Sequence, residues 1–351
     1  MILISSDMQP FSPERSADVR KATGQLRQAA QERHIMVGSA VRDFPLRFSS
    51  RYRRLLGGEF NMLTPENAMK WDVVHPQRNT YNFSQADRIV DFASKREFAV
   101  RGHTLVWHKA LPSWLTKGNF SPDELRSILK DHITTVVGRY KGKVYVWDVL
   151  NEIINESGQF QPSIWHTALG EQYIADAFRI AHQADPSAKL FYNEAGAEGL
   201  TPHTDAVYEL VRKLRSQGVP IHGIGFQMHI DAVEGLDYEG IRKNLERFSK
   251  LGLEIHITEM DIKVQDLPGT MEERLKVQAE MYRKIMQVAS SIPNFKAWVQ
   301  WGLTDKFSWI TDSLPAGKKD SPLIFDKYFR PKEAYFSMTD TLRRGRKPGG
   351  K

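Results

Sequence analysis

At positions 144–153 the chain reads Val144-Tyr145-Val146-Trp147-Asp148-Val149-Leu150-Asn151-Glu152-Ile153. These apolar, β-branched and aromatic residues follow a Gly142-Lys143 turn signal and predict a buried β-strand. A buried carboxylate costs several kcal/mol unless it is neutralised, paired or hydrogen-bonded, so Glu152 is unexpected where such a strand ends. Two interpretations are open from this stretch alone. Either Glu152 reaches a cleft, where an apolar wall keeps it neutral and able to act as a general acid, or it pairs with an Arg elsewhere.

The rest of the chain repeats this pattern, because short apolar runs alternate with amphipathic helical stretches. Candidate strands lie at residues 35–41, 59–63, 99–107, 144–151, 189–193, 223–228, 253–259 and 297–303. A Pro follows Ser12 at a first helical position, and capping boxes begin at Ser121 and Thr270, each with Glu three residues later. Helical periodicity is clear at residues 86–95 and 125–140.

Eight alternations of strand and helix predict an α/β fold, a (β/α)8 TIM barrel formed by a single catalytic domain at residues 13–342. Residues 1–12 and 343–351 are expected to be flexible terminal extensions. The alternative is a doubly wound open sheet, which would favour a Gly-rich phosphate turn after the first strand. Residues 35–40 do not form such a turn, because they contain one Gly only.

Unusual polar and aromatic residues fall at the C-terminal end of a predicted strand or just beyond it. They are Glu66, Asn67, Lys70, His103, Trp107, His108, Asn151, Glu152, Asn193, Glu194, Gln227, His229, Glu259, Asp261, Trp301, Asp305 and Trp309. In a barrel all of these strand ends point to one face, and that face carries the active site. Core polar residues placed at random would not follow the strand direction, so the pattern predicts one shared site.

Two carboxylic acids in this set, Glu152 and Glu259, are the minimal apparatus for glycoside hydrolysis. One protonates the leaving oxygen, and the other attacks the sugar or activates water. Alternation along residues 253–259 predicts that Glu259 shares the axis-facing side with Ile255 and Ile257, and that His256 faces away as a structural residue. The tryptophans offer flat faces for sugar rings, and the amides and the Lys offer hydrogen bonds for hydroxyls, although a single Trp or His is more often a core residue.

Composition narrows the class of protein. The absence of Cys excludes disulfides and thiolate metal sites, and no apolar run approaches the roughly 20 residues of a membrane span. The net charge is +7, and much of the positive excess lies in residues 343–351. A nucleic-acid-binding patch is disfavoured there, because no aromatic residues lie between the basic ones. A zinc site at His103 and His108 is disfavoured, because an i,i+5 pair on a strand points to opposite faces. We expect no metal, membrane or nucleic-acid partner.

Six blocks stand out in chain order and span nearly the whole sequence: Glu66–Trp71, Gly102–His108, Trp147–Glu152, His222–His229, Ile257–Asp261 and Trp301–Lys306. Together they resemble glycoside hydrolase family 10, the endo-β-1,4-xylanases. The resemblance implies a (β/α)8 barrel that cleaves internal β-1,4 bonds of xylan with retention, by double displacement and without a cofactor. We expect a monomer that binds xylan and xylo-oligosaccharides. We also expect it to be extracellular, with its signal peptide absent or removed, and a cytoplasmic location is the alternative.

The resemblance also implies roles at matching positions. Glu152 matches the general acid/base and Glu259 the nucleophile, while Asn151 matches the residue that binds the 2-hydroxyl of the sugar being cleaved. His229 and Asp261 match the pair that keeps the nucleophile ionised and oriented. The family has a cis peptide bond after the residue that matches His103. Matches to substrate-binding residues are Glu66, Asn67, Lys70, His103, Trp107, Asn193, Gln227, Trp301 and Trp309.

The sequence departs from the family pattern near the expected cleft. Ala110 stands where the family commonly has Gln, and Ala195 and Gly196 stand where it has Tyr and Asn. That Tyr stacks on an aglycone sugar, so the composition of the aglycone side is open. The alternatives are a barrel hydrolase acting on β-1,4-glucan, a non-catalytic sugar-binding barrel and a metal hydrolase.

Overall fold

The computed structural model describes residues 24–315 and 318–344, and eight parallel strands form a closed barrel at its centre. Their order around the barrel is β1 (Met36–Val41), β2 (Met62–Pro65), β3 (Ala99–Val106), β4 (Val146–Asn151), β5 (Lys189–Glu194), β6 (Gly223–Phe226), β8 (Glu254–Lys263) and β9 (Phe295–Gln300). The ring closes where β9 pairs with β1, and the short strand β7 (His229–Asp231) pairs with the end of β8. The predicted (β/α)8 barrel is confirmed.

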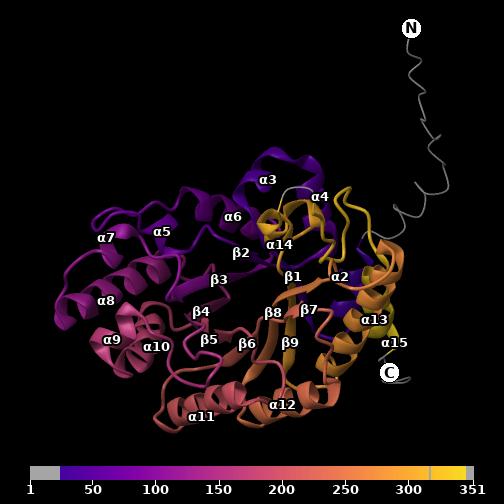
Figure 1. Ribbon diagram of the computed structural model, residues 1–351. Coiled ribbons are helices and arrows are strands. Elements are labelled where there is room, and N and C mark those ends of the chain that lie inside the picture. The colour runs from indigo at the N-terminus through magenta and orange to yellow at the C-terminus, as the bar shows by residue number, and fades with distance from the viewer. Residues whose placement is uncertain (1–23, 316–317, 345–351) are drawn as a thin grey trace.

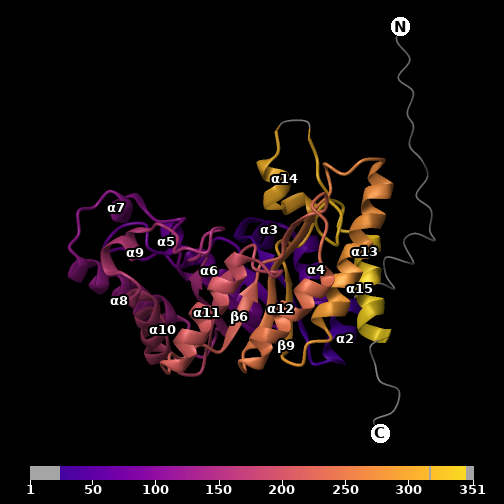
Figure 2. The ribbon, with the colours of Figure 1, turned by 60° about the horizontal axis from the view of Figure 1, so that its bottom comes forward.

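Helices surround the barrel on all sides (Figure 1). They are α2 (Gln25–Gln31), α3 (Asp43–Phe48), α4 (Ser50–Glu59), α5 (Trp71–Val74), α6 (Ser84–Ser94), α7 (Ser113–Thr116), α8 (Pro122–Arg139), α9 (Ile164–Leu169), α10 (Gln172–Ala184), α11 (Pro202–Ser216), α12 (Tyr238–Lys250), α13 (Met271–Ala289), the 3₁₀-helix η1 (Asp305–Phe307), α14 (Trp309–Ser313) and α15 (Glu333–Arg344). Figure 2 shows α14, which follows β9, projecting beyond one end of the barrel above α3.

Local signals in the sequence place most elements correctly. The helices expected at 86–95 and 125–140 are α6 and α8, and α8 and α13 begin with the predicted capping boxes. The strand expected at 59–63 is displaced, because Glu59 ends α4 and accepts hydrogen bonds from Gly24 N at 2.6 Å and Tyr335 Oη at 2.9 Å. The helix start expected at Ser12 lies outside the described residues, as do residues 345–351 of the expected C-terminal extension.

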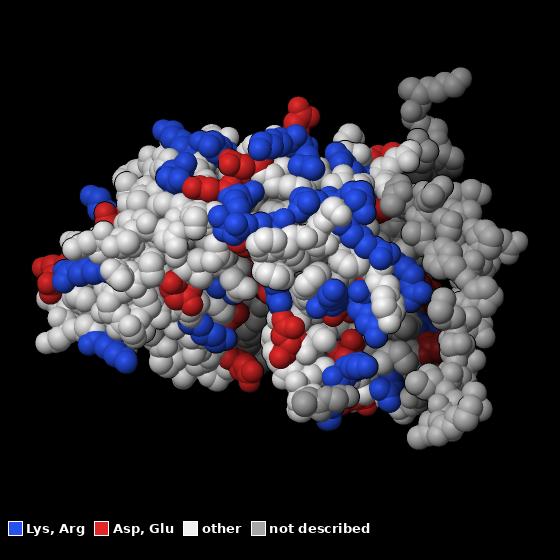
Figure 3. All heavy atoms as spheres, turned by 90° about the horizontal axis from the view of Figure 1, so that it is seen from above, with Lys and Arg blue, Asp and Glu red and all other residues white. Residues whose placement is uncertain are grey.

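The folded part of the chain also carries positive charge. Figure 3 looks onto the side that bears α3 and α4, and Lys and Arg lie in a band across it. These two helices carry the exposed residues Arg47, Arg51 and Arg54. The positive charge is therefore not confined to the C-terminal residues.

The barrel interior holds a buried ion pair instead of a purely apolar filling. Arg101 of β3 is fully buried; it donates to both oxygens of Asp148 on β4, with Nε 3.0 Å from Oδ2. Its Nη1 lies 3.0 Å from Nδ1 of His256 on β8. Gly225 of β6 leaves room for this group, because a Cβ there would lie 2.8 Å from Nη2 of Arg101. The bonds to β4 and β8 show that Arg101 reaches across the barrel interior.

The substitution Arg101→Met is expected to lower the free energy of unfolding by about 3–5 kcal/mol, because it leaves the buried carboxylate of Asp148 without its cation. Urea denaturation followed by circular dichroism measures the change. The control is Arg212→Met on α11, whose ion pair with Glu209 is exposed to solvent, so this substitution is expected to leave the free energy of unfolding nearly unchanged. Equal effects of the two substitutions would contradict a structural role for Arg101.

Candidate active site

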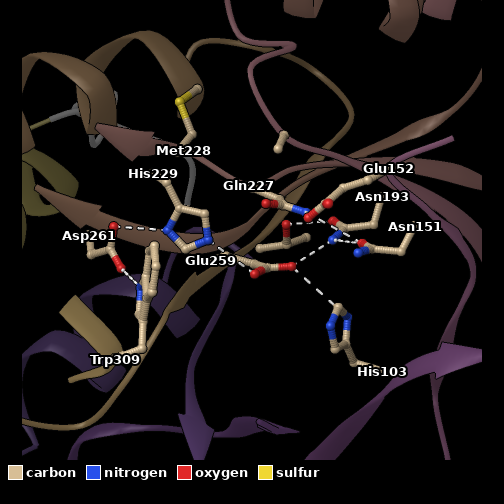
Figure 4. A network of polar contacts seen from close by, with 12 residues as sticks. His103, Asn151, Glu152, Asn193, Gln227, Met228, His229, Glu259, Asp261 and Trp309 are labelled. Carbon is tan, nitrogen blue, oxygen red and sulfur yellow. Dashed lines mark hydrogen bonds and ion pairs between the residues drawn. The ribbon is translucent and has the colours of Figure 1, made fainter. Parts of the chain in front are cut away.

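Polar side chains from four strands of the barrel converge at the C-terminal ends of these strands (Figure 4). Asn151 ends β4, Asn193 lies near the end of β5, and Glu259 lies on β8. Nδ2 of Asn193 donates to Oδ1 of Asn151 at 2.8 Å and to Oε1 of Glu259 at 2.7 Å. Hydrogen bonds therefore join the site across the mouth of the barrel.

Two β-bulges aim these residues inward. The register of β4 against β5 shifts between Asp148 and Leu150, and that of β8 against β9 shifts between Ile257 and Met260. Each shift inserts one extra residue directly before an active-face residue, which changes the side that the following side chain faces.

The alternation predicted along β8 is therefore wrong in detail. His256 contacts Arg101 inside the barrel, whereas it was expected to face away. Ile255 and Ile257 are buried in the main apolar cluster with the helices, not in the small cluster of β2 and β9 residues inside the barrel. Glu259 reaches the site because of the bulge, since strict alternation from His256 would place it on the helix side.

Glu259 is almost fully buried and is held by fixed partners on both oxygens. Besides the bond from Asn193, Oε2 accepts from Nε2 of His229 at 3.2 Å, and Nδ1 of His103 lies 3.9 Å from Oε1. Both ring nitrogens of His229 are engaged, because Nδ1 lies 2.9 Å from Oδ1 of Asp261. The orientation of Glu259 is thus defined by residues from β3, β5 and β7.

His229 carries a proton at neutral pH. Burial alone would lower its pKa, but the carboxylates of Asp261 and Glu259 outweigh burial and raise the pKa of His229 well above its usual value. Asp261 is fixed in turn by Nε1 of Trp309, which donates to Oδ2 at 2.8 Å. A cation therefore lies beside Glu259, with a buried carboxylate behind it.

Glu152 directly follows β4 with a backbone φ of +51°, a left-handed conformation that non-glycine residues seldom adopt and that is frequent at functional sites. Oε2 accepts hydrogen bonds from Nζ of Lys109 at 2.9 Å and from Nε1 of Trp107 at 3.0 Å. Oε1 accepts from Nε2 of Gln227 at 3.1 Å. Neither interpretation offered by the sequence is right in full, because the partner of Glu152 is a Lys in the cleft.

The expected neutral form of Glu152 is also wrong for the unliganded protein. Burial alone would raise the pKa of Glu152, but hydrogen bonds from Lys109, Gln227 and Trp107 outweigh burial and lower the pKa below its usual value. Glu152 is therefore ionised at neutral pH. Lys109 was not predicted as a site residue, because an isolated Lys in a loop is usually a solvated surface residue.

The remaining predicted residues form a rim beside the two acids. Glu66 is buried and accepts from Nε of Arg42 at 2.8 Å, and Nζ of Lys70 donates to Oδ1 of Asn67 at 2.8 Å. The Trp301 ring stands edge-on to His103, with ring centroids 5.2 Å apart. Trp309 stands in the same way against His229 at 5.2 Å. The cis bond expected after His103 is present. Arg42, which orders Glu66, was missed in the sequence.

Other features of the described residues bear on the class of site. No group of three or more His, Cys, Asp or Glu among them is arranged to hold a metal ion. None of the helices in residues 24–315 and 318–344 is long and apolar enough to cross a membrane. His103 donates toward the buried Asp148, with Nδ1 3.0 Å from Oδ2, and does not pair with His108. The site is thus a set of carboxyl, amide and imidazole groups with aromatic walls.

Comparisons with known proteins agree with this picture. The family model Glycosyl hydrolase family 10 matches residues 25–341. Endo-1,4-beta-xylanase B of Thermotoga neapolitana is 44% identical over 319 residues, which cover 90% of this chain and 91% of that protein. The beta-1,4-xylanase of Dictyoglomus thermophilum is 39% identical over 315 residues, which cover 87% of this chain and 88% of that protein.

Solved structures give the same result. The crystal structure of xylanase 10B from Thermotoga maritima matches with a TM-score of 0.87 and 43% identity, covering 91% of this chain and 98% of that one. Xylanase 10B from Thermotoga petrophila, crystallised in complex with xylobiose, matches with a TM-score of 0.87 and 41% identity, covering 97% of this chain and 99% of that one.

Proposed function

This chain belongs to glycosyl hydrolase family 10, and from that premise we propose that it is an endo-1,4-β-xylanase that hydrolyses internal bonds of xylan with retention. Glu259 is the nucleophile and Glu152 the general acid/base. The observation that carries the proposal is the pair of strand-end carboxyl groups with different surroundings. Glu259 is buried and fixed on both oxygens, whereas Glu152 borders the cleft and contacts an exposed Lys.

In the first step the Glu259 carboxylate attacks the anomeric carbon of the bound sugar. The bond from this carbon to the glycosidic oxygen breaks, and that oxygen takes a proton from Glu152. In the second step a water molecule attacks the anomeric carbon and gives a proton to Glu152, while the bond to Glu259 breaks. Two inversions at one carbon give net retention.

The surrounding groups support these roles. His229, which is protonated, donates to the oxygen Oε2 of Glu259 and so stabilises the negative charge that Glu259 regains when the covalent bond breaks. Oδ1 of Asn151 accepts from Asn193 and Gln227, and no acceptor among the described residues takes a hydrogen bond from its Nδ2. This amide nitrogen is therefore left to donate to a substrate hydroxyl, in agreement with the role implied by the family resemblance.

The substrate follows from the relatives and from the rim. The relatives are named xylanases, and one was crystallised with xylobiose. Among the predicted substrate-binding residues, Glu66 and Lys70 are hydrogen-bonded to protein partners, and the Trp301 ring packs against His103. Because these side chains are already ordered, binding a sugar costs less conformational entropy.

The proposal is tested by the stereochemistry of the first products. Xylohexaose is expected to release oligomers whose new reducing ends are β-anomers, visible by proton NMR before mutarotation adds the α-form. An initial α-anomer would contradict double displacement. Cellohexaose serves as the control substrate, and equal turnover of the two hexaoses would contradict the assignment to xylan.

A further inference from the structure

A second part of the cleft lies beside Glu152 and is distinct from the rim described above. It has a volume of about 800 Å³ and is lined by the loops that follow β3, β4 and β5, among them residues Lys109, Glu194, Gly196 and His203. None of the predicted glycone residues Glu66, Lys70, Trp301 or Trp309 lines it. The substitutions Ala195 and Gly196 leave this part open, so the leaving portion of a substrate that passes Glu152 enters it next to Lys109.

Lys109 is the most exposed of the three donors that hold Glu152. Its side chain is 59% exposed, and its only hydrogen bond to a described residue is the one to Oε2 of Glu152. Trp107 and Gln227 are neutral and more deeply placed, since Trp107 packs against His103 and Gln227 also bonds Asn151. The Lys109 ammonium lies 5.3 Å from the centroid of the Trp107 ring, at the border of the open part of the cleft.

In the unliganded protein the contacts of Glu152 favour its carboxylate form, and the one lone pair without a donor lies on Oε1. Three donors, Lys109, Trp107 and Gln227, point at its two oxygens, and a carboxyl hydrogen on Oε2 would face two of them. Removal of the ammonium group frees one lone pair of Oε2, which the carboxyl hydrogen can then occupy. Departure of Lys109 therefore favours the protonated form of Glu152 that acid catalysis uses.

We propose that Lys109 is a positioning residue that couples occupation of the aglycone cleft to the protonation state of Glu152. This inference rests on the proposed function and deepens it. When the leaving sugar enters, its hydroxyl oxygens take over the Lys109 ammonium, and Glu152 is free to hold the proton that the glycosidic oxygen receives. When this sugar departs, Lys109 returns to Oε2 and favours the carboxylate that must take a proton from water.

The other charged and titratable groups around Glu152 come from four elements. Lys70 follows β2, His108 precedes Lys109 after β3, and Glu194 ends β5. Glu259 lies across the site on β8 (Figure 4). Burial raises the pKa of Glu194 to about 8, and burial and Lys109 lower the pKa of His108. These groups are fixed by the fold, whereas Lys109 can respond to a ligand.

The test is the pH dependence of Lys109→Met on two substrates. On xylohexaose the basic limb of kcat/KM, which follows Glu152 in the free enzyme, is expected to move to higher pH. Above the pH of the parent enzyme's basic limb, kcat/KM of the variant, expressed as a fraction of its own maximum, is expected to exceed the same fraction for the parent enzyme several-fold. The basic limb of kcat is expected to stay in place, because the bound aglycone already holds Lys109 away in the parent enzyme.

A second substrate tests the return of Lys109. With dinitrophenyl β-xylobioside the second step limits the rate and the aglycone cleft is empty, so the acidic limb of kcat follows Glu152 as a base. In Lys109→Met this limb is expected to move to higher pH, with several-fold loss on the acidic side. Lys109→Arg is expected to restore both limbs, and Lys117→Met, an exposed Lys in the next loop, is expected to shift neither.

The inference would be overturned if both limbs of Lys109→Met stayed at the positions of the parent enzyme, or if kcat and kcat/KM shifted equally on xylohexaose. A loss of rate without a shift of either limb would mean a purely structural contact and would overturn it as well. Failure of the proposed function is seen separately, because Glu152→Ala would then keep its turnover of xylan whatever Lys109→Met does.

Discussion

Replacement of Glu259 by Gln is expected to lower kcat on xylohexaose by at least about a thousandfold, because an amide cannot form the covalent glycosyl intermediate. The amide nearly conserves the size of the side chain, so the packing around it is kept, although one of the donors Asn193 and His229 then faces the amide NH2 group. Binding of xylotriose, measured by calorimetry, is therefore expected to persist. Glu259→Gln is therefore expected to lower kcat without weakening substrate binding.

The matched control is Glu254→Gln on the same strand. Glu254 lies at the opposite end of β8, where it pairs with Lys189 and not with any group of the site. This variant is expected to keep the kcat of the parent enzyme. A Glu259→Gln enzyme that turned over xylohexaose within tenfold of the parent rate would remove Glu259 from the reaction, and the double-displacement proposal with it.

The architecture of the chain was predictable because its signals are local. The stretch from Val144 to Asn151 is apolar, begins after a turn and is in fact strand β4. Capping boxes at Ser121 and Thr270 begin helices where the sequence places them. Since parallel strands of a barrel present their C-terminal ends on one face, the polar residues after each strand could be assigned to one site without knowledge of any contact.

The orientation of Glu259 was predicted correctly for a wrong reason. Alternation from Ile255 does not lead to the barrel axis, because the bulge between Ile257 and Met260 adds one residue to β8. A bulge depends on pairing with β9, about forty residues further along the chain, and has no reliable local signal. For the same reason the contact between His256 and Arg101 could not be foreseen.

The charge of Glu152 was the least predictable property of the site. Its pKa depends on the balance between burial and three hydrogen bonds from two distant loops. The donors Trp107 and Gln227 were recognised as site residues, but their contact with Glu152 was not, and Lys109 was not predicted to belong to the site. Sequence patterns locate a carboxyl group more readily than they determine its protonation.

Replacement of Glu152 by Ala is expected to lower turnover of xylan by about 10²–10⁴-fold, the usual contribution of a general acid. The effect must depend on the leaving group. Dinitrophenyl β-xylobioside has a leaving group that needs no proton, so formation of the covalent intermediate is expected to continue at nearly the parent rate. Its hydrolysis slows, because Glu152 no longer takes the proton from water.

The two substrates separate this role from a structural one. With the dinitrophenyl substrate, Glu152→Ala is expected to show a burst of dinitrophenolate followed by slow turnover, as measured by stopped-flow absorbance. Added azide, an anion that attacks without losing a proton, is expected to restore turnover and give a β-xylosyl azide. Glu209→Ala, on the outer face of α11, is the control and is expected to show neither effect.

A uniform loss on both substrates, without a burst and without azide rescue, would contradict the assignment of Glu152. Such a result would mean that Ala at position 152 disturbs Trp107 and Gln227 instead of removing a proton donor. The burst has a second use, because its amplitude requires a covalent intermediate on Glu259. The Glu152→Ala variant therefore also tests the role of Glu259. The expected pattern appears only if Glu152 is the acid/base and Glu259 is the nucleophile.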